Sequence, residues 1–158
     1  MQIKFGTDGW RAIIAQEFTT DNVARVAYAT ALWVKSISQN PSISIGHDCR
    51  FGGSLFTETA IKVLCSEGVK VYAHKGICAT PMISLACVKL NTTAGVVITA
   101  SHNPPSYNGF KLKSNYGGPT TPADIAKVEA LIPEKTNIPT ITLEELQVKN
   151  LLEYVDME

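Results

Sequence analysis

A polar loop carrying a hydroxyl, an imidazole and an amide follows an apolar run of the sequence. The segment Thr99-Ala100-Ser101-His102-Asn103-Pro104-Pro105 comes directly after residues 94–98, and its two prolines stiffen the backbone. A serine in a rigid loop is a candidate nucleophile, although its hydroxyl needs a base, a cation or a metal to become reactive. The pattern therefore predicts a nucleophile at Ser101.

The neighbours of Ser101 differ in how well they could activate it. His102 is adjacent, but neighbouring side chains of an extended segment point apart, so the sequence does not imply a dyad. Lys111 is a better companion, because Asn108-Gly109 predicts a turn that returns the chain beside Ser101. An ammonium group there would attract a phosphate and assist proton transfer.

Two arginines lie in further polar loops and could bind anionic oxygens with their planar guanidinium groups. Arg11 belongs to the loop at residues 6–11, and Arg50 to the loop at residues 47–53. The plainer interpretation makes Arg11 a solvated charge and pairs Arg50 with Asp48 in an ordinary loop ion pair of little energetic value. In the same way, a single loop serine most often bonds its own backbone.

The elements that must position these loops alternate between strands and helices. Apolar periodicity, capping residues and turn residues predict strands at residues 3–5, 42–46, 69–73, 94–99 and 107–113, and helices at 21–38, 54–67, from Thr80 onward, and at 121–131. The order predicts an α/β fold, a three-layer αβα domain with a largely parallel, mixed sheet. In such folds ligands bind at the carboxyl ends of the parallel strands, where the three polar loops fall.

The last part of the sequence differs from the rest. Residues 1–132 suit one α/β domain, whereas the tail has prolines at 133 and 139 and ends in a charged segment, 143–158. That segment has a helical pattern with little core-facing apolar surface. We therefore expect residues 133–158 to form a linker, or the start of a further domain.

Composition restricts the partners. Fourteen Lys and Arg balance fourteen Asp and Glu, so the chain lacks the positive field that nucleic acids or anionic membranes require. The composition is 45% hydrophobic, but the apolar stretch at 23–34 contains Arg25 and is too short to span a bilayer. The N-terminus has no secretory pattern and the four cysteines form no C-x-x-C pair, which predicts a cytoplasmic protein with free thiols.

Three segments together resemble the α-D-phosphohexomutases, the family of phosphoglucomutase and phosphomannomutase. They are Phe5-Gly6-Thr7-Asp8-Gly9-Trp10-Arg11, Thr99-Ala100-Ser101-His102-Asn103-Pro104 and Tyr107-Asn108-Gly109-Phe110-Lys111, and they stand in the family's order. The resemblance covers nearly the whole chain and corresponds to the first of the family's four domains.

The resemblance implies a role for each candidate residue. Ser101 would carry the phosphoryl group that is exchanged with a hexose phosphate through a bisphosphate intermediate, and a phosphate oxygen on Ser101 would bind magnesium. Lys111 would transfer a proton or supply charge, His102 would lie beside the phosphoryl group, and Arg11 would contact the anion. Asn103 and Arg50 are further candidate phosphate-binding residues, and an activator of the glucose 1,6-bisphosphate type is expected.

The chain also departs from the family pattern. It has no D-G-D-G-D loop, from which the family takes its other magnesium ligands, and no sugar-recognition or distal phosphate loop. These belong to domains absent from this chain, so the chain alone is expected to be inactive or nearly so. Alternatives are the phosphoglucosamine mutase branch, which the segment around Lys111 resembles less, and a non-catalytic phosphosugar-binding module. A serine hydrolase is disfavoured because Ser101 lacks the G-x-S-x-G pattern.

Overall fold

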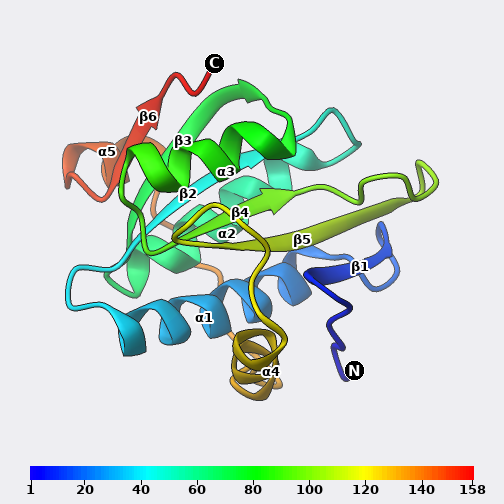
Figure 1. Cartoon of the computed structure of the whole chain (residues 1–158). Coiled ribbons are helices and arrows are strands. Elements are labelled where there is room, and N and C mark those ends of the chain that lie inside the picture. Colours follow the sequence, from blue (N-terminus) through cyan, green and yellow to red (C-terminus); the bar gives the residue numbers. More distant parts are fainter.

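A computed structural model describes all of residues 1–158 and shows one mixed sheet of six strands covered by helices (Figure 1). In chain order the elements are β1 (Gly9–Ile13), α1 (Thr20–Ile37), β2 (Ser42–His47), α2 (Gly53–Ser66), β3 (Lys70–Ile77), α3 (Thr80–Lys89), β4 (Ala94–Ile98), β5 (Tyr107–Ser114), α4 (Pro122–Ala130), α5 (Leu143–Val148) and β6 (Leu152–Val155). The predicted α/β order is confirmed, with boundaries of most elements within a few residues.

The strand order is β1-β5-β4-β2-β3-β6. The pairs β4–β2, β2–β3 and β3–β6 are parallel, whereas β4–β5 and β5–β1 are antiparallel. Helices connect β2, β3 and β4, and a short loop returns the chain from β4 into β5. A crossover through a helix permits parallel pairing, and a short connection forces antiparallel pairing. The expected three-layer fold with a mixed, mostly parallel sheet is therefore confirmed.

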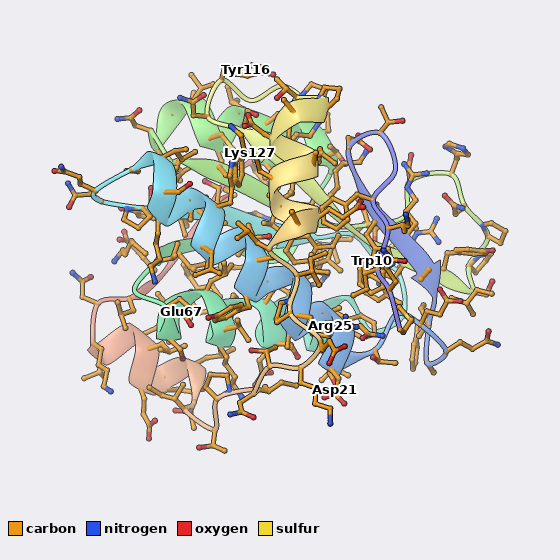
Figure 2. All side chains as sticks on the ribbon, turned by 90° about the horizontal axis from the view of Figure 1, so that it is seen from below. Trp10, Asp21, Arg25, Glu67, Tyr116 and Lys127 are labelled. Carbon is orange, nitrogen blue, oxygen red and sulfur yellow. The ribbon has the colours of Figure 1, made fainter.

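The helix α1 shows how the sequence builds the lower layer. The Thr19 hydroxyl accepts a hydrogen bond from the Asn22 N–H at 3.2 Å and caps the helix N-terminus. Small buried residues, Ala27, Thr30 and Ala31, face the interior and allow close packing against α2. Figure 2 views this layer from below, with α4 lying against α1. No helix in the structure combines the length and the apolar character needed to cross a membrane.

The helix α3 covers the opposite face of the sheet (Figure 1). Beneath it lies a small apolar cluster of Cys78, Ile83, Cys87 and Val97, separate from the main core of 32 residues. The cysteines are free thiols, and only Cys49 is exposed. Burial raises the pKa of the Cys78 thiol to about 11, so this side chain behaves as a small apolar group.

The first strand lies later in the sequence than expected. The strand predicted at residues 3–5 is wrong, because Gly9–Ile13 forms β1 instead. Alternation explains the difference, since Trp10 and Ala12 are buried while Arg11 between them is exposed. Ile3 is nevertheless part of the core, and the Phe5 N–H donates to a carboxylate oxygen of Glu129 at 2.8 Å.

The C-terminal segment contributes more to this fold than expected. The helix predicted across 143–158 ends at Val148, and residues 152–155 form β6, which extends the sheet beside β3. Leu146 and Leu152 are 1% and 2% exposed and belong to the main core, so the expected lack of core-facing apolar surface is also wrong. That residues 133–158 lead into a further domain stays a prediction.

Candidate active site

The polar loops meet at one edge of the sheet because their strands end there together. His47 of β2 pairs with Ile98 of β4, and the next residues leave both strands at the same level. The Asp48 N–H donates to the Ile98 carbonyl at 3.2 Å, which ties the two loops at their origin. Figure 1 shows the loops after β2 and β4 on the same side of the sheet, next to β1. The predicted convergence at the carboxyl ends of the parallel strands is confirmed for the loops after β2 and β4. It is wrong for the segment 6–11, because residues 9–11 belong to β1, which pairs antiparallel with β5 and follows no parallel strand.

Ser101 is exposed and adopts a left-handed backbone conformation, with φ of 53°. Such a conformation costs a residue with a side chain about 1–3 kcal/mol, so its surroundings must hold it there. The Ser101 N–H donates to the Thr99 hydroxyl oxygen at 3.1 Å. Its carbonyl accepts a hydrogen bond from Arg50 at 2.8 Å. Both polar backbone groups of Ser101 are therefore held by side chains.

The left-handed turn also brings the neighbouring imidazole toward the serine. The Ser101 Oγ lies 3.5 Å from His102 Nδ1, at the long limit of a hydrogen bond. The expectation that these side chains point apart is wrong, because the loop is a tight turn rather than an extended segment. Both side chains are exposed, so the contact leaves the hydroxyl accessible.

Arg50 has its guanidinium group directed at the backbone of the Ser101 loop. One terminal nitrogen donates to the carbonyls of Ser101 and Asn103, at 2.8 and 2.6 Å. The other donates to the carbonyls of Pro104 and Tyr107, at 2.7 and 2.9 Å. The predicted ion pair with Asp48 is present, with 3.6 Å between the Arg50 Nε and a carboxylate oxygen, but the four carbonyl bonds were not expected. They leave Arg50 poorly placed for the predicted role of a free anion contact. Its donors are occupied, and the residue holds the loop.

Asp48 connects Arg50 to the other side of the loop. One carboxylate oxygen accepts from the Arg50 N–H at 3.0 Å, and the other accepts from the Thr99 hydroxyl at 2.6 Å. The second oxygen also lies 3.6 Å from the Arg50 Nε. The carboxylate thus joins Arg50 and Thr99, the two residues that bind the Ser101 backbone. Sequence reasoning missed Thr99 and Asp48 as members of one network.

Arg11 reaches the same loop from β1. One of its guanidinium nitrogens donates to the Asn103 side-chain oxygen at 2.8 Å. Arg11 is exposed and makes no ion pair, so its other donors face solvent at the edge of the site. The structure therefore brings Arg11 and Asn103 together beside the serine loop, in a position compatible with anion binding.

Lys111 lies in β5, and its ammonium is 3.4 Å from the Asp8 carboxylate. Asn108 and Gly109 belong to the same strand, so the turn predicted there is wrong, and the chain returns earlier, where the Tyr107 N–H donates to the Pro104 carbonyl at 3.0 Å. A side chain at position 109 would collide with the Thr99 carbonyl oxygen. Glycine at 109 therefore permits the close approach of β5 to the site.

Lys113 is a second lysine on the same side of β5 and was not among the predicted site residues. It is 8% exposed, and burial lowers its pKa below the usual value. The positive charge of Lys111 lowers the Lys113 pKa further, while Asp8 partly opposes the shift. Alternation in a strand places residues 111 and 113 on one face, and this was the signal that could have identified it. The two lysines make this face of the strand electropositive.

The sequence matches the family described as phosphoglucomutase/phosphomannomutase, alpha/beta/alpha domain I, over residues 2–138. A phosphoglucosamine mutase from Prochlorococcus marinus (strain AS9601) is 37% identical over 157 residues, which cover 97% of this chain and 34% of that protein. A phosphoglucomutase from Staphylococcus haemolyticus is 38% identical over 114 residues, 70% of this chain and 21% of that protein.

A solved structure agrees with these sequence matches. The crystal structure of a protein named as a phosphomannomutase, from Thermus thermophilus, superimposes with a TM-score of 0.90 at 34% identity. The match covers 99% of this chain and 34% of that chain, so this chain spans about a third of the length of such relatives. The chain therefore belongs to the phosphoglucomutase/phosphomannomutase family and corresponds to its α/β/α domain I.

Proposed function

We propose that this chain is the phosphoserine-bearing domain of a sugar-phosphate mutase that interconverts hexose 1-phosphate and 6-phosphate. The observation that carries the proposal is the exposed Ser101, whose strained backbone is fixed by side chains at the carboxyl edge of the parallel strands. A fixed, accessible hydroxyl is what reversible phosphoryl transfer needs, since positioning and charge neutralisation supply most of the catalysis.

In the proposed reaction, phosphorylated Ser101 gives its phosphoryl group to a hydroxyl of the hexose phosphate. The bond between phosphorus and the serine oxygen breaks, a bond to the sugar oxygen forms, and the sugar hydroxyl loses its proton. The resulting bisphosphate then reverses its orientation in the site, and its other phosphoryl group is returned to Ser101. A sugar bisphosphate would in addition act as activator, because it phosphorylates a serine that has lost its group.

The side chains around Ser101 would divide the remaining work. Lys111 and His102 are the candidates for accepting or returning the proton and for neutralising charge on the phosphoryl oxygens. Arg11 would contact an anionic oxygen with the donors that Asn103 leaves free. This assignment removes Arg50 from the expected phosphate-binding residues, because its terminal nitrogens are occupied by carbonyl groups. Asn103 stays a candidate through its amide N–H group, since its side-chain oxygen accepts from Arg11.

Magnesium is the metal that the family resemblance implies. The chain contains no group of three His, Cys, Asp or Glu residues that could hold a metal ion, and Asp48 is engaged by Thr99 and Arg50. Within this chain the fit is therefore limited to one oxygen on phosphorylated Ser101, and the proposal assigns the other ligands to further domains. The bound ion would neutralise charge on the transferred phosphoryl group.

The relatives of this chain are named for different sugars. Relatives named phosphoglucosamine mutase and phosphoglucomutase are 37% and 38% identical to this chain, so sequence identity does not select between them. A protein named as a probable phosphoribomutase, from Schizosaccharomyces pombe, is 34% identical. We place glucose and mannose phosphates first and glucosamine phosphate as the alternative, with sugar recognition outside this domain.

The decisive experiment is intact-mass and peptide analysis of the complete protein from its own cells, combined with two serine variants. Ser101→Ala should carry no phosphate and lose mutase activity at least a thousandfold, with an unchanged circular dichroism spectrum. Ser106→Ala is the matched control in the same loop and should retain both properties. A wild-type protein that never carries phosphate on Ser101 would favour a phosphosugar-binding module, and normal activity of Ser101→Ala would refute the mutase proposal.

A further inference from the structure

The loop after β2 has no part in the proposed reaction, yet it makes most of the bonds to the serine loop. We propose that Arg50 is a positioning residue that fixes the backbone of Ser101 in its left-handed conformation and so aims the Ser101 hydroxyl for phosphoryl transfer. This inference rests on the proposed function for its catalytic consequence. Its structural part, that Arg50 holds the loop, is independent of the reaction.

Arg50 directs the N–H donors of both its terminal nitrogens at the serine loop. A guanidinium group has five N–H donors, and here its two terminal nitrogens bind four carbonyls of the loop at 2.6 to 2.9 Å. The remaining donor, at Nε, faces the Asp48 carboxylate at 3.6 Å. The side chain is 12% exposed, so these bonds are largely shielded from water. No terminal nitrogen is left without a carbonyl partner to bind a substrate phosphate.

The carbonyls that Arg50 binds are distributed along the whole serine loop. They belong to Ser101, Asn103, Pro104 and Tyr107, so they span the loop from the candidate nucleophile to the first residue of β5. Carbonyls of one turn that point toward a common centre repel each other, and a single cation at that centre removes the repulsion. Arg50 is therefore placed to stabilise the shape of the entire turn.

One connected network of hydrogen bonds holds Ser101 on both sides. Arg50 binds the Ser101 carbonyl, and Thr99 accepts from the Ser101 N–H. Asp48 accepts from the Thr99 hydroxyl and from the backbone N–H of Arg50, so the two contacts share a carboxylate. Loss of either contact frees one side of a residue whose φ of 53° is unfavourable. Relaxation to negative φ would turn the hydroxyl away.

The test compares Arg50→Lys with Arg25→Lys in the complete protein. Lysine keeps the charge but has a single nitrogen with three donors, which cannot span four carbonyls. Arg25 is a matched control, because it is a buried arginine of α1 that also binds backbone carbonyls, those of Pro133 at 2.7 Å and Met1 at 3.0 Å. Figure 2 shows it next to the chain that follows α4.

Two measurements separate positioning from general destabilisation. Amide hydrogen exchange of peptides across residues 99–109 should be at least tenfold faster in Arg50→Lys than in wild type, and unchanged in Arg25→Lys. The kcat of Arg50→Lys should fall at least thirtyfold with KM changed less than threefold, since the serine is misplaced but the sugar site is intact. Guanidinium ions should partly restore the kcat of Arg50→Ala, and sodium ions should not.

Unchanged exchange across residues 99–109 in Arg50→Lys would overturn the inference, as would an equal loss of kcat in Arg25→Lys. If Arg50→Lys does not fold, Thr99→Val cuts the same network at the Ser101 N–H, and Thr99→Ser should restore wild-type exchange and kcat. Faster exchange in a protein whose wild type has no mutase activity would support the holding role of Arg50 and refute only the proposed function. The two claims can therefore fail separately.

Discussion

Two lysines of β5 and the Asp8 carboxylate influence one another electrostatically. The Asp8 carboxylate pairs with Lys111 at 3.4 Å, and the charge of Lys111 contributes to the lowered pKa of Lys113. A phosphate that enters this region would meet Lys111, whose charge is balanced by Asp8, and Lys113, which is partly desolvated. The charge of Lys111 consequently acts on Asp8 and on its neighbouring lysine.

We expect Lys111→Met to slow phosphoryl transfer from Ser101 about a hundredfold to a thousandfold, the usual effect of removing one contact to a developing oxyanion. Methionine preserves the length and apolar stem of the lysine, so the fold should stay intact. The measurement is the single-turnover loss of phosphate from Ser101 to sugar phosphate in the complete protein. Lys89→Met, at an exposed position of α3, is the control, and an equal rate in both variants would make Lys111 a surface charge.

At the scale of single residues, the sequence predicts a nucleophile at Ser101 but does not reveal the residues that hold its backbone. The family resemblance rests on three short segments that contain Ser101, Arg11 and Lys111. Because these segments are continuous in the sequence, they can be recognised without a structure. The bonds of Arg50 go to backbone carbonyls, which every residue possesses and which leave no trace in the sequence. Only the three-dimensional arrangement distinguishes this arginine from an ordinary partner of Asp48.

Among the elements, β5 determines how closely the lysines approach the serine loop. Its Gly109 lies against the Thr99 carbonyl, and the Thr99 N–H donates to the Gly109 carbonyl at 3.0 Å. The sequence Asn108-Gly109 is typical of turns, which explains the turn predicted there. Here the glycine is needed for close approach of two strands, the other common reason for a glycine within a sheet.

Gly109→Ala should therefore destabilise the protein by about 1–3 kcal/mol, because the added methyl group overlaps the Thr99 carbonyl. Gly76→Ala is the matched control, since a Cβ at position 76 meets no atom within 4 Å and should change stability little. Urea unfolding of both variants measures the difference. Equal stabilities would show that β5 can move away from the loop without cost.

The helices and parallel strands are predictable because their apolar periods are long and regular. The helix α1 was expected at 21–38 and lies at Thr20–Ile37. The strand β6 was missed because it has only four residues, Leu152-Glu153-Tyr154-Val155, and follows a short helix closely. A short edge strand gains its stability from pairing with β3, a contact that local sequence does not reveal.

For the whole molecule, the C-terminal segment is a structural part of this domain. Leu146→Ala should lower the free energy of unfolding by about 2–5 kcal/mol, since the side chain is 1% exposed and its loss leaves a cavity. Val148→Ala, two residues later and 88% exposed, should change it by less than about 0.5 kcal/mol. Chemical unfolding of the two variants decides whether α5 belongs to the core or only lies on it.

The strand order also affects how this domain forms during synthesis. The strand β1 is made first, yet its partner in the sheet is β5, which lies after β2, β3 and β4 in the chain. Until the ribosome has produced β5, the backbone of β1 has no strand to pair with, and Trp10 has only partners such as Phe18, on which it stacks. Closing such a long segment of chain is slow and leaves apolar surface exposed meanwhile. The strand β1 therefore stays unpaired until most of this domain has been made.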